Sequence, residues 1–159
     1  MAPSIARSDY EALAELRYQI RRFLYVSEQA ARAAGLEPQQ HQLMLALKGF
    51  PKGARPRIGE LAERLQTRHH STVELVNRLA AVGHIVRHRA SGNRRGEDRR
   101  EVFLSLTPSG EKILRELSLH HRRELRMQGP ALISALKRTI RTNTSDRRRK
   151  TTSRTRRTR

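Results

Sequence analysis

The sequence predicts a mainly α-helical protein with a small β-hairpin, organised as a winged helix-turn-helix with N- and C-terminal dimerisation helices. Apolar residues recur three and four positions apart along most of the chain, which is helical spacing. Only in residues 85–106 does this spacing change to the alternation that is typical of strands. The resulting order of three helices, a hairpin and a further helix is the plan of a winged helix-turn-helix.

The first predicted helix begins at a cap formed by Ser8 or Asp9 and runs toward Ala34, with Gly35 as its stop. One face carries recurring residues at helical spacing: Leu13, Leu16, Ile20, Phe23, Leu24 and Ser27. Such a helix of roughly 25 residues is long for a small domain, as a dimerisation arm would be.

The central region predicts three shorter helices. Pro38 suits the first position of a helix, and the two Pro and one Gly in residues 50–56 predict a loop after it. A helix over Ile58–Leu65 and a turn then follow. Ser71 or a neighbouring residue opens the next helix, which ends at Gly83 with an inward side formed by Val73, Val76, Leu79 and Ala80.

Alternating residues, the period of a strand, predict strands at Ile85–Arg89 and Val102–Leu106, with a long polar tip between them. Thr107 can cap a helix that Pro108 starts, and Gly129 with Pro130 predicts its break before a last helix. The predicted segments are an N-terminal dimerisation helix (1–36), a DNA-binding lobe (37–110), C-terminal dimerisation helices (111–142) and a disordered basic tail (143–159).

The formal charge of +19 indicates a nucleic acid partner. Arg147–Arg159 contributes eight of these charges, which leaves +11 for the remainder of the chain.

The chain has no Cys, which excludes thiol chemistry and Cys-based zinc sites. No signal-peptide or membrane-span segment is present, and the basic runs lack a wide apolar face, so we expect a cytoplasmic protein without membrane binding.

The helix that begins near Ser71 carries a polar face suited to reading base edges in a major groove. Together with the preceding turn it comprises Thr67, Arg68, His70, Ser71, Glu74, Asn77 and Arg78. The hairpin tip adds residues that could enter a minor groove or clamp phosphates: Arg94, Arg95, Asp98, Arg99 and Arg100. The alternatives are an ordinary solvated helix face and a mobile charged loop.

Several of these motifs resemble the multiple-antibiotic-resistance regulator (MarR) family. They are Leu61-Ala62-Glu63-Arg64-Leu65, the run from Ser71 to Leu79, and Asp98-x-Arg100 followed by Leu104-x-Leu106-Thr107-x-x-Gly110. The resemblance covers about Tyr10 to Ile140. It implies a homodimer on a palindromic operator, with repression often relieved by a small ligand. The basic tail departs from the family pattern, the last helix looks short, and the Cys of the peroxide-sensing branch is missing.

A small-molecule effector pocket could be lined by Tyr18, Arg22, Tyr25, His41 and Met44, although packing is an equally good explanation of these residues. The seven His have poor ligand spacing, so we expect no metal and no cofactor. The sequence lacks a phosphate-cradling Gly loop, a Gly-x-Ser-x-Gly elbow and a zinc helix, so we expect no enzyme.

The expected function is therefore that of a sequence-specific DNA-binding transcription regulator, a repressor that acts as a homodimer. The alternative is a non-specific nucleic-acid-binding protein driven by its basic surface and tail. A membrane- or protein-binding adaptor is a third class, which predicts no DNA binding at physiological salt.

Overall fold

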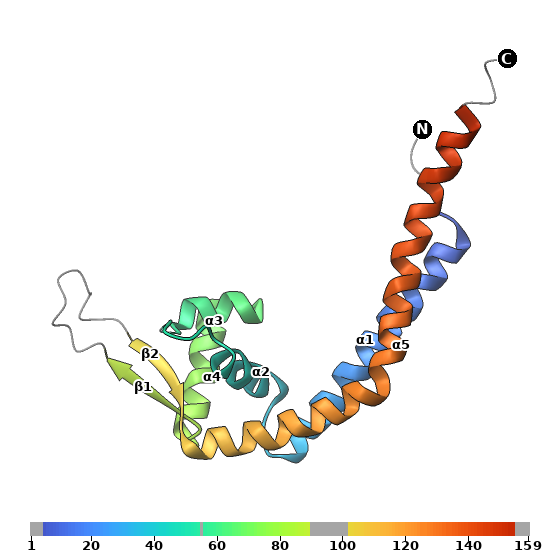
Figure 1. Cartoon of the computed structure of the whole chain (residues 1–159). Coiled ribbons are helices and arrows are strands. Elements are labelled where there is room, and N and C mark those ends of the chain that lie inside the picture. The colour runs from blue at the N-terminus through green and yellow to red at the C-terminus, as the bar shows by residue number, and fades with distance from the viewer. Residues whose placement is uncertain (1–4, 55, 90–101, 155–159) are drawn as a thin grey trace, which may run out of the picture. The chain divides into compact units, whose positions relative to one another are not determined.

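A computed structural model describes residues 5–54, 56–89 and 102–154, the side chains of 142–154 excepted. Its described elements are five α-helices and one two-stranded antiparallel sheet (Figure 1), so the predicted mainly α-helical fold with a small β-hairpin is confirmed. The chain divides into two compact units. We call Glu28–His120 the lobe, and Met1–Ser27 together with His121–Arg159 the arm.

The lobe contains the three short helices and the hairpin. It also includes the end of the long helix α1 (Arg7–Ala33) and the beginning of α5 (Pro108–Arg154). Its own elements are α2 (Pro38–Lys48), α3 (Ile58–Leu65), α4 (His69–Ala81), β1 (Ile85–Arg89) and β2 (Val102–Leu106).

Helices α2 and α3 begin where the sequence predicted them. At α2 the backbone N–H of Glu37 donates to Gln40 Oε1 at 2.9 Å, and at α3 the N–H of Arg57 donates to Glu60 Oε2 at 3.0 Å. A side chain three residues into each helix thus satisfies a backbone donor at the helix start. These local bonds stabilise the start of each helix.

The hairpin also has its predicted bounds. β1 pairs with β2 in an antiparallel register that runs from Ile85 opposite Leu106 to Arg89 opposite Val102. Before it, α4 ends with Gly83 at a φ of 73°, and the N–H of His84 donates to Leu79 O at 2.9 Å. This left-handed turn, which glycine adopts at little cost, redirects the chain from α4 into the strand.

The connection between the hairpin and α5 is short and closely packed. Thr107 Oγ1 accepts the N–H of Gly110 at 3.1 Å, which confirms the predicted cap, and its hydroxyl donates to Gly83 O at 2.6 Å. A Cβ on Gly110 would lie only 2.1 Å from the carbonyl oxygen of His84. The start of α5 therefore approaches β1 so closely that only glycine fits at this position.

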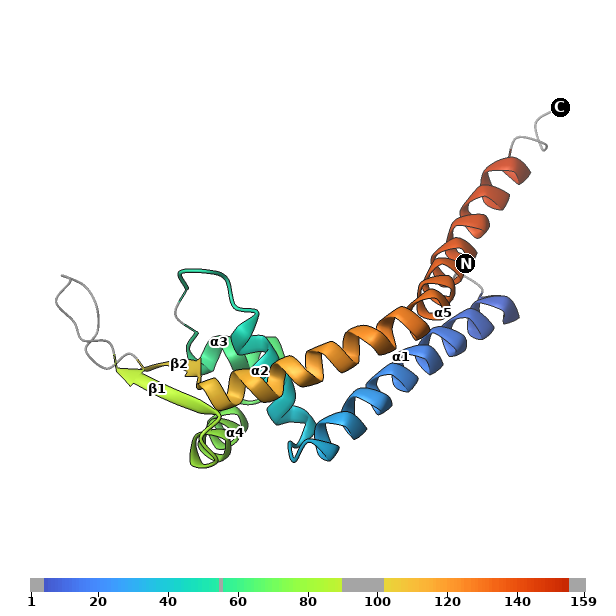
Figure 2. The same ribbon diagram turned by 60° about the horizontal axis from the view of Figure 1, so that its bottom comes forward.

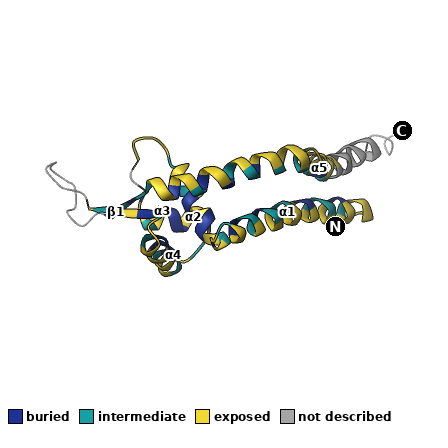
Figure 3. Cartoon of the chain, turned by 90° about the horizontal axis from the view of Figure 1, so that it is seen from below, coloured by how far each residue is buried: buried dark blue, intermediate teal, exposed yellow. Residues whose placement is uncertain are grey.

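The lobe has a contiguous apolar core. Figure 3 shows buried residues concentrated on α2, α3 and α4. The core cluster consists of Ala31, Leu36, Leu43, Met44, Leu47, Leu61, Leu75, Val76, Leu79, Ile85, Leu104, Leu114 and Leu117. Every element of the lobe contributes to it, so the core holds α4 and the hairpin stem in place.

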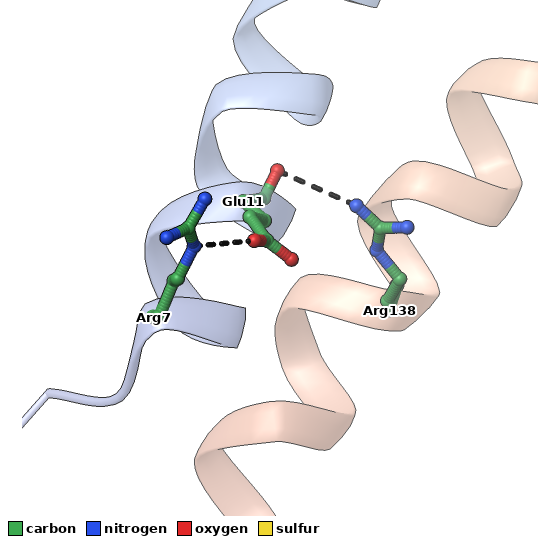
Figure 4. A network of polar contacts seen from close by, with 3 residues as sticks. All are labelled: Arg7, Glu11 and Arg138. Atoms are coloured by element: carbon green, nitrogen blue, oxygen red, sulfur yellow. Dashed lines mark hydrogen bonds and ion pairs between the residues drawn. The ribbon is translucent and has the colours of Figure 1, made fainter.

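In the arm, α1 lies alongside the C-terminal part of α5 (Figures 1 and 2). Ala12 and Ala135 are buried, and Thr139 Oγ1 lies 3.1 Å from Ala12 O and 3.0 Å from Ala135 O. Figure 4 shows Glu11 between two arginines: its carboxylate pairs with Arg7 Nε at 3.1 Å, and its backbone oxygen accepts from Arg138 at 3.4 Å. Small residues and backbone carbonyls thus form this contact.

The first helix differs from its prediction at two points. It begins at Arg7, and Asp9 lies inside the first turn, where its Oδ2 accepts the N–H of Ala6 at 3.0 Å. A carboxylate three residues after the cap can satisfy the cap's N–H, which is why Asp9 does not begin the helix. On the predicted apolar face Ser27 is buried, whereas Leu13 and Leu24 are exposed.

The predicted helix break at Gly129 and Pro130 is wrong, because Pro130 lies inside the continuous helix α5. A proline in a helix interior costs about 3 kcal/mol, but the turns after it already pack against α1 through Ala135 and Thr139. The predicted disordered tail is also corrected over residues 143–154, which continue α5. Arg and Lys favour helix, and extending a formed helix requires no new nucleation.

Candidate nucleic-acid interface

Helix α4 has one buried side and one polar side. It begins at His69 with Arg68 as the N-cap, earlier than the predicted opening at Ser71. Its buried residues are Thr72, Leu75, Val76 and Leu79, whereas Val73 and Ala80, which the sequence also predicted to face inward, are only half-buried. Sequence reasoning missed Leu75, although its four-residue spacing from Leu79 was a usable signal.

The turn between α3 and α4 is held by a pair of threonines. Gln66 ends α3 in the left-handed conformation, with a φ of 54°. The hydroxyls of Thr67 and Thr72 lie 2.9 Å apart, and the Thr72 hydroxyl also lies 3.3 Å from the carbonyl oxygen of Arg68. Thr67 was predicted to contact DNA, and in this structure its hydroxyl fixes the angle at which α4 leaves the turn.

The other predicted residues of this face lie on the outward side of α4 or at its cap. Ser71 is half-buried, and the exposed residues are Arg68, His70, Glu74, Asn77 and Arg78. Glu74 and Arg78 lie one turn apart, with 3.9 Å between Oε2 and Nη2. A pair this exposed contributes only about 0–1 kcal/mol to stability, so both side chains can exchange this contact for another partner.

Asn77 has a partner that sequence reasoning missed. Arg87, on β1, donates a hydrogen bond from Nη2 to Asn77 Oδ1. Strand alternation places Arg87 on the same side of β1 as the buried Ile85, and α4 packs against this strand. That alternation was the available signal, but only the folded lobe shows which residue of α4 lies opposite Arg87.

The stem of the hairpin is reinforced by side chains. The rings of His88 and Phe103, which are opposite each other in the ladder, stack with centroids 4.9 Å apart. His88 Nε2 lies 2.7 Å from Ser105 Oγ. The predicted wing residues Arg94, Arg95, Asp98, Arg99 and Arg100 lie outside the described residues, so their role stays a prediction.

The predicted effector residues occupy different environments. His41 and Met44 are buried in the lobe, while Tyr18, Arg22 and Tyr25 are exposed on α1. A cavity of about 590 Å³ in the lobe has other walls, namely Arg57, Ile58, Gly59, Glu60, Glu63, His69 and Val102. The effector pocket therefore stays a prediction.

Within the part of the chain that the structure describes, no three His, Asp or Glu residues are grouped as metal ligands would be. No described helix combines the length and the apolar character that crossing a bilayer requires.

Comparison with known proteins finds a family model that matches part of the chain and solved structures that share its fold. A MarR family model matches residues 34–96. AbsC, a MarR family transcriptional regulator from Streptomyces coelicolor, has a similar fold, with a TM-score of 0.69 at 18% identity, covering 92% of this chain and 99% of that one. A MarR family protein from Bacillus stearothermophilus has a TM-score of 0.66 at 19% identity, and the match covers 90% of this chain and 99% of that one.

A third solved structure is a MepR mutant from S. aureus bound to an oligodeoxyribonucleotide. It has a TM-score of 0.60 at 16% identity, and the match covers 86% of this chain and 93% of that one. No curated protein sequence matches the chain. The family model covers α2, α3, α4 and β1, and so includes the helix that carries the polar face described above. The resemblance read from the sequence is therefore confirmed over residues 34–96, and the chain shares its fold with solved MarR family structures.

Proposed function

We propose that this protein is a homodimeric, sequence-specific DNA-binding transcription regulator that represses from a palindromic operator. One observation carries the proposal: α4 buries Thr72, Leu75, Val76 and Leu79 and turns a continuous polar face outward. A helix anchored in this way can enter a major groove with its polar side chains directed toward base edges. The MarR family match and the formal charge of +19 support the same function.

The arm supports the homodimer. It exposes many large apolar side chains, all but Ile5 on its two helices: Ile5, Tyr10, Leu13, Tyr18, Ile20, Leu24, Tyr25, Leu125, Met127, Ile133, Leu136 and Ile140. Exposed apolar surface of this extent marks an interaction site. A second copy bound by two-fold symmetry would cover the same residues on both chains, and would present two α4 helices to the two halves of a palindrome.

Selection of bound fragments from genomic DNA tests this function. Full-length protein should enrich a small set of fragments that share an inverted repeat, and should hold them against an excess of unrelated DNA. At physiological salt a specific site should be bound roughly 10³-fold or more tightly than random duplex. A chain that enriches no common sequence contradicts the proposal.

A second candidate, non-specific nucleic acid binding, is favoured by the eight basic residues in Arg147–Arg159. It predicts equal affinity for all duplexes and a salt slope of about −0.9 per phosphate neutralised. A chain truncated after residue 143 separates the two candidates. We expect it to lose affinity for random DNA while keeping its preference for the selected operator.

Release by a small ligand completes the proposal and is supported by the family resemblance. The small-molecule fraction of a cell extract should displace labelled operator from the protein, and should do so in proportion to its concentration. Full retention of the operator at every concentration would remove this part of the proposal and leave the DNA-binding part intact.

A further inference from the structure

The side-chain amide of Asn77 has a defined orientation. Its Oδ1 accepts a hydrogen bond from Nη2 of Arg87. A guanidinium has five donors and no acceptor, so it can only bond the oxygen end of an amide. The NH₂ group of Asn77 is the other end of the same planar amide, and it is therefore directed away from Arg87.

The guanidinium reaches Asn77 from an element that the fold holds firmly. Arg87 lies in the centre of β1, between Ile85, which is buried, and Arg89. Its ladder partner on β2 is Leu104, a residue of the core. The backbone of Arg87 is therefore fixed relative to α4 by strand pairing and by the lobe core.

We propose that Arg87 positions Asn77 as a hydrogen-bond donor toward the bases and thereby helps to determine which base the protein selects. The inference rests on the proposed function, in which α4 reads the major groove. A free asparagine can form a bidentate pair with adenine, in which its oxygen accepts from N6 and its nitrogen donates to N7. With the oxygen held by Arg87, the amide presents its donors.

Donors favour base edges that carry acceptors. These are O6 and N7 of guanine, N7 of adenine and O4 of thymine, whereas the N4 amino group of cytosine is itself a donor. We therefore expect cytosine to be the base that is most strongly disfavoured opposite Asn77. Without Arg87 the amide could rotate by half a turn, and the preference would be lost.

The interaction should have its effect in the complex with DNA. Both side chains are exposed in the free protein, where water competes for the same hydrogen bonds. When α4 enters a groove, this water is removed and the remaining hydrogen bonds become stronger. Arg87 should therefore alter base preference much more than it alters the stability of the folded chain.

The experiment measures the affinity of the full-length protein for its selected operator and for versions with each base pair replaced in turn. Asn77→Ala, Arg87→Met and the double variant are compared with the parent protein. We expect each single variant to reduce discrimination at the same operator position by about threefold to tenfold, and the double variant to add little more. Arg87→Lys, which keeps a donor, should retain much of the preference.

Arg89→Met is the matched control, because Arg89 is an exposed arginine on the same face of the same strand. It should leave the base preference profile unchanged. The inference is overturned if Arg87→Met weakens binding equally for every operator, is additive with Asn77→Ala and reduces the salt slope by about one, because this is how a phosphate contact behaves. A parent chain that selects no operator would instead remove the proposed function, and this inference with it.

Discussion

The lobe and the arm are both helical and both rich in apolar residues, but they bury different side chains. In the lobe the fully buried residues include Leu43, Met44 and Leu79. In the arm the buried residues are small or polar: Ala12, Gln19, Ser27, His121 and Ala135. The lobe therefore completes its own core, whereas the arm leaves its large apolar side chains exposed in a single chain.

The chemistry of the α1–α5 contact explains this difference. Alanines allow the two helices to approach closely, and Thr139 and Arg138 donate to backbone carbonyls of α1. A close contact through small residues covers little apolar area, so leucines and isoleucines on the other faces stay exposed. A hydrophobic surface of this kind is stabilised by association, and its stability should depend on protein concentration.

The largest effect is expected in the lobe from Gly110→Ala. The new methyl group would collide with the carbonyl of His84, and relief requires a backbone shift at the start of α5. We expect a loss of about 4 kcal/mol in the free energy of unfolding, measured by urea denaturation.

Gly59→Ala is the control for this change, because a Cβ at Gly59 in α3 meets nothing within 4 Å. It should leave stability unchanged or raise it by up to about 1 kcal/mol, since alanine favours helix. Equal stability of the two variants would show that the close approach of α5 to β1 is not present in solution.

A matched pair of leucines compares the two regions directly. Leu43, in the lobe, has 0% exposure, whereas Leu13, in the arm, is 46% exposed. Leu43→Ala should cost about 3 kcal/mol by leaving a cavity, at every protein concentration. Leu13→Ala should cost less than about 0.5 kcal/mol in dilute protein and more as the concentration rises. A concentration-independent loss for Leu13→Ala would contradict the role assigned to the arm.

Ile133→Glu tests the association surface itself. Ile133 is 53% exposed on α5, so a glutamate is tolerated in a single chain but would be buried between two copies. We expect the dimer to weaken by about 2 kcal/mol or more, which sedimentation can detect, while the unfolding of the lobe is unchanged. Glu124→Gln, a change on the same helix that buries no charge, is the control. A variant that sediments like the parent would show that this face does not associate.

The smallest effect is expected from Gly129→Ala in the arm. A Cβ there meets nothing within 4 Å, and glycine lies in the interior of α5 immediately before Pro130. Alanine should change the helix stability of the arm by less than about 1 kcal/mol, measured by thermal unfolding, because its higher helix propensity is opposed by contact between its Cβ and the ring of Pro130. A larger loss of stability would contradict a continuous α5 at this point.

Elements whose signals are local could be predicted from the sequence. Pro38 located α2, the spacing of apolar residues located α3, and alternation of apolar and polar residues located both strands, because these signals depend only on neighbours along the chain. The polar face of α4 followed from its spacing in the same way. These predictions did not depend on which elements pack against one another.

Contacts between residues on different elements, in contrast, followed from the packing of the folded chain. The pairing of Arg87 with Asn77, the need for glycine at 110 and the passage of α5 through Pro130 each depend on a second segment brought close by the fold. The same holds for Leu13, which has the pattern of a core residue and lies exposed in a single chain. Periodicity shows which side of a helix is apolar, but what covers that side is set by packing at a distance in the sequence.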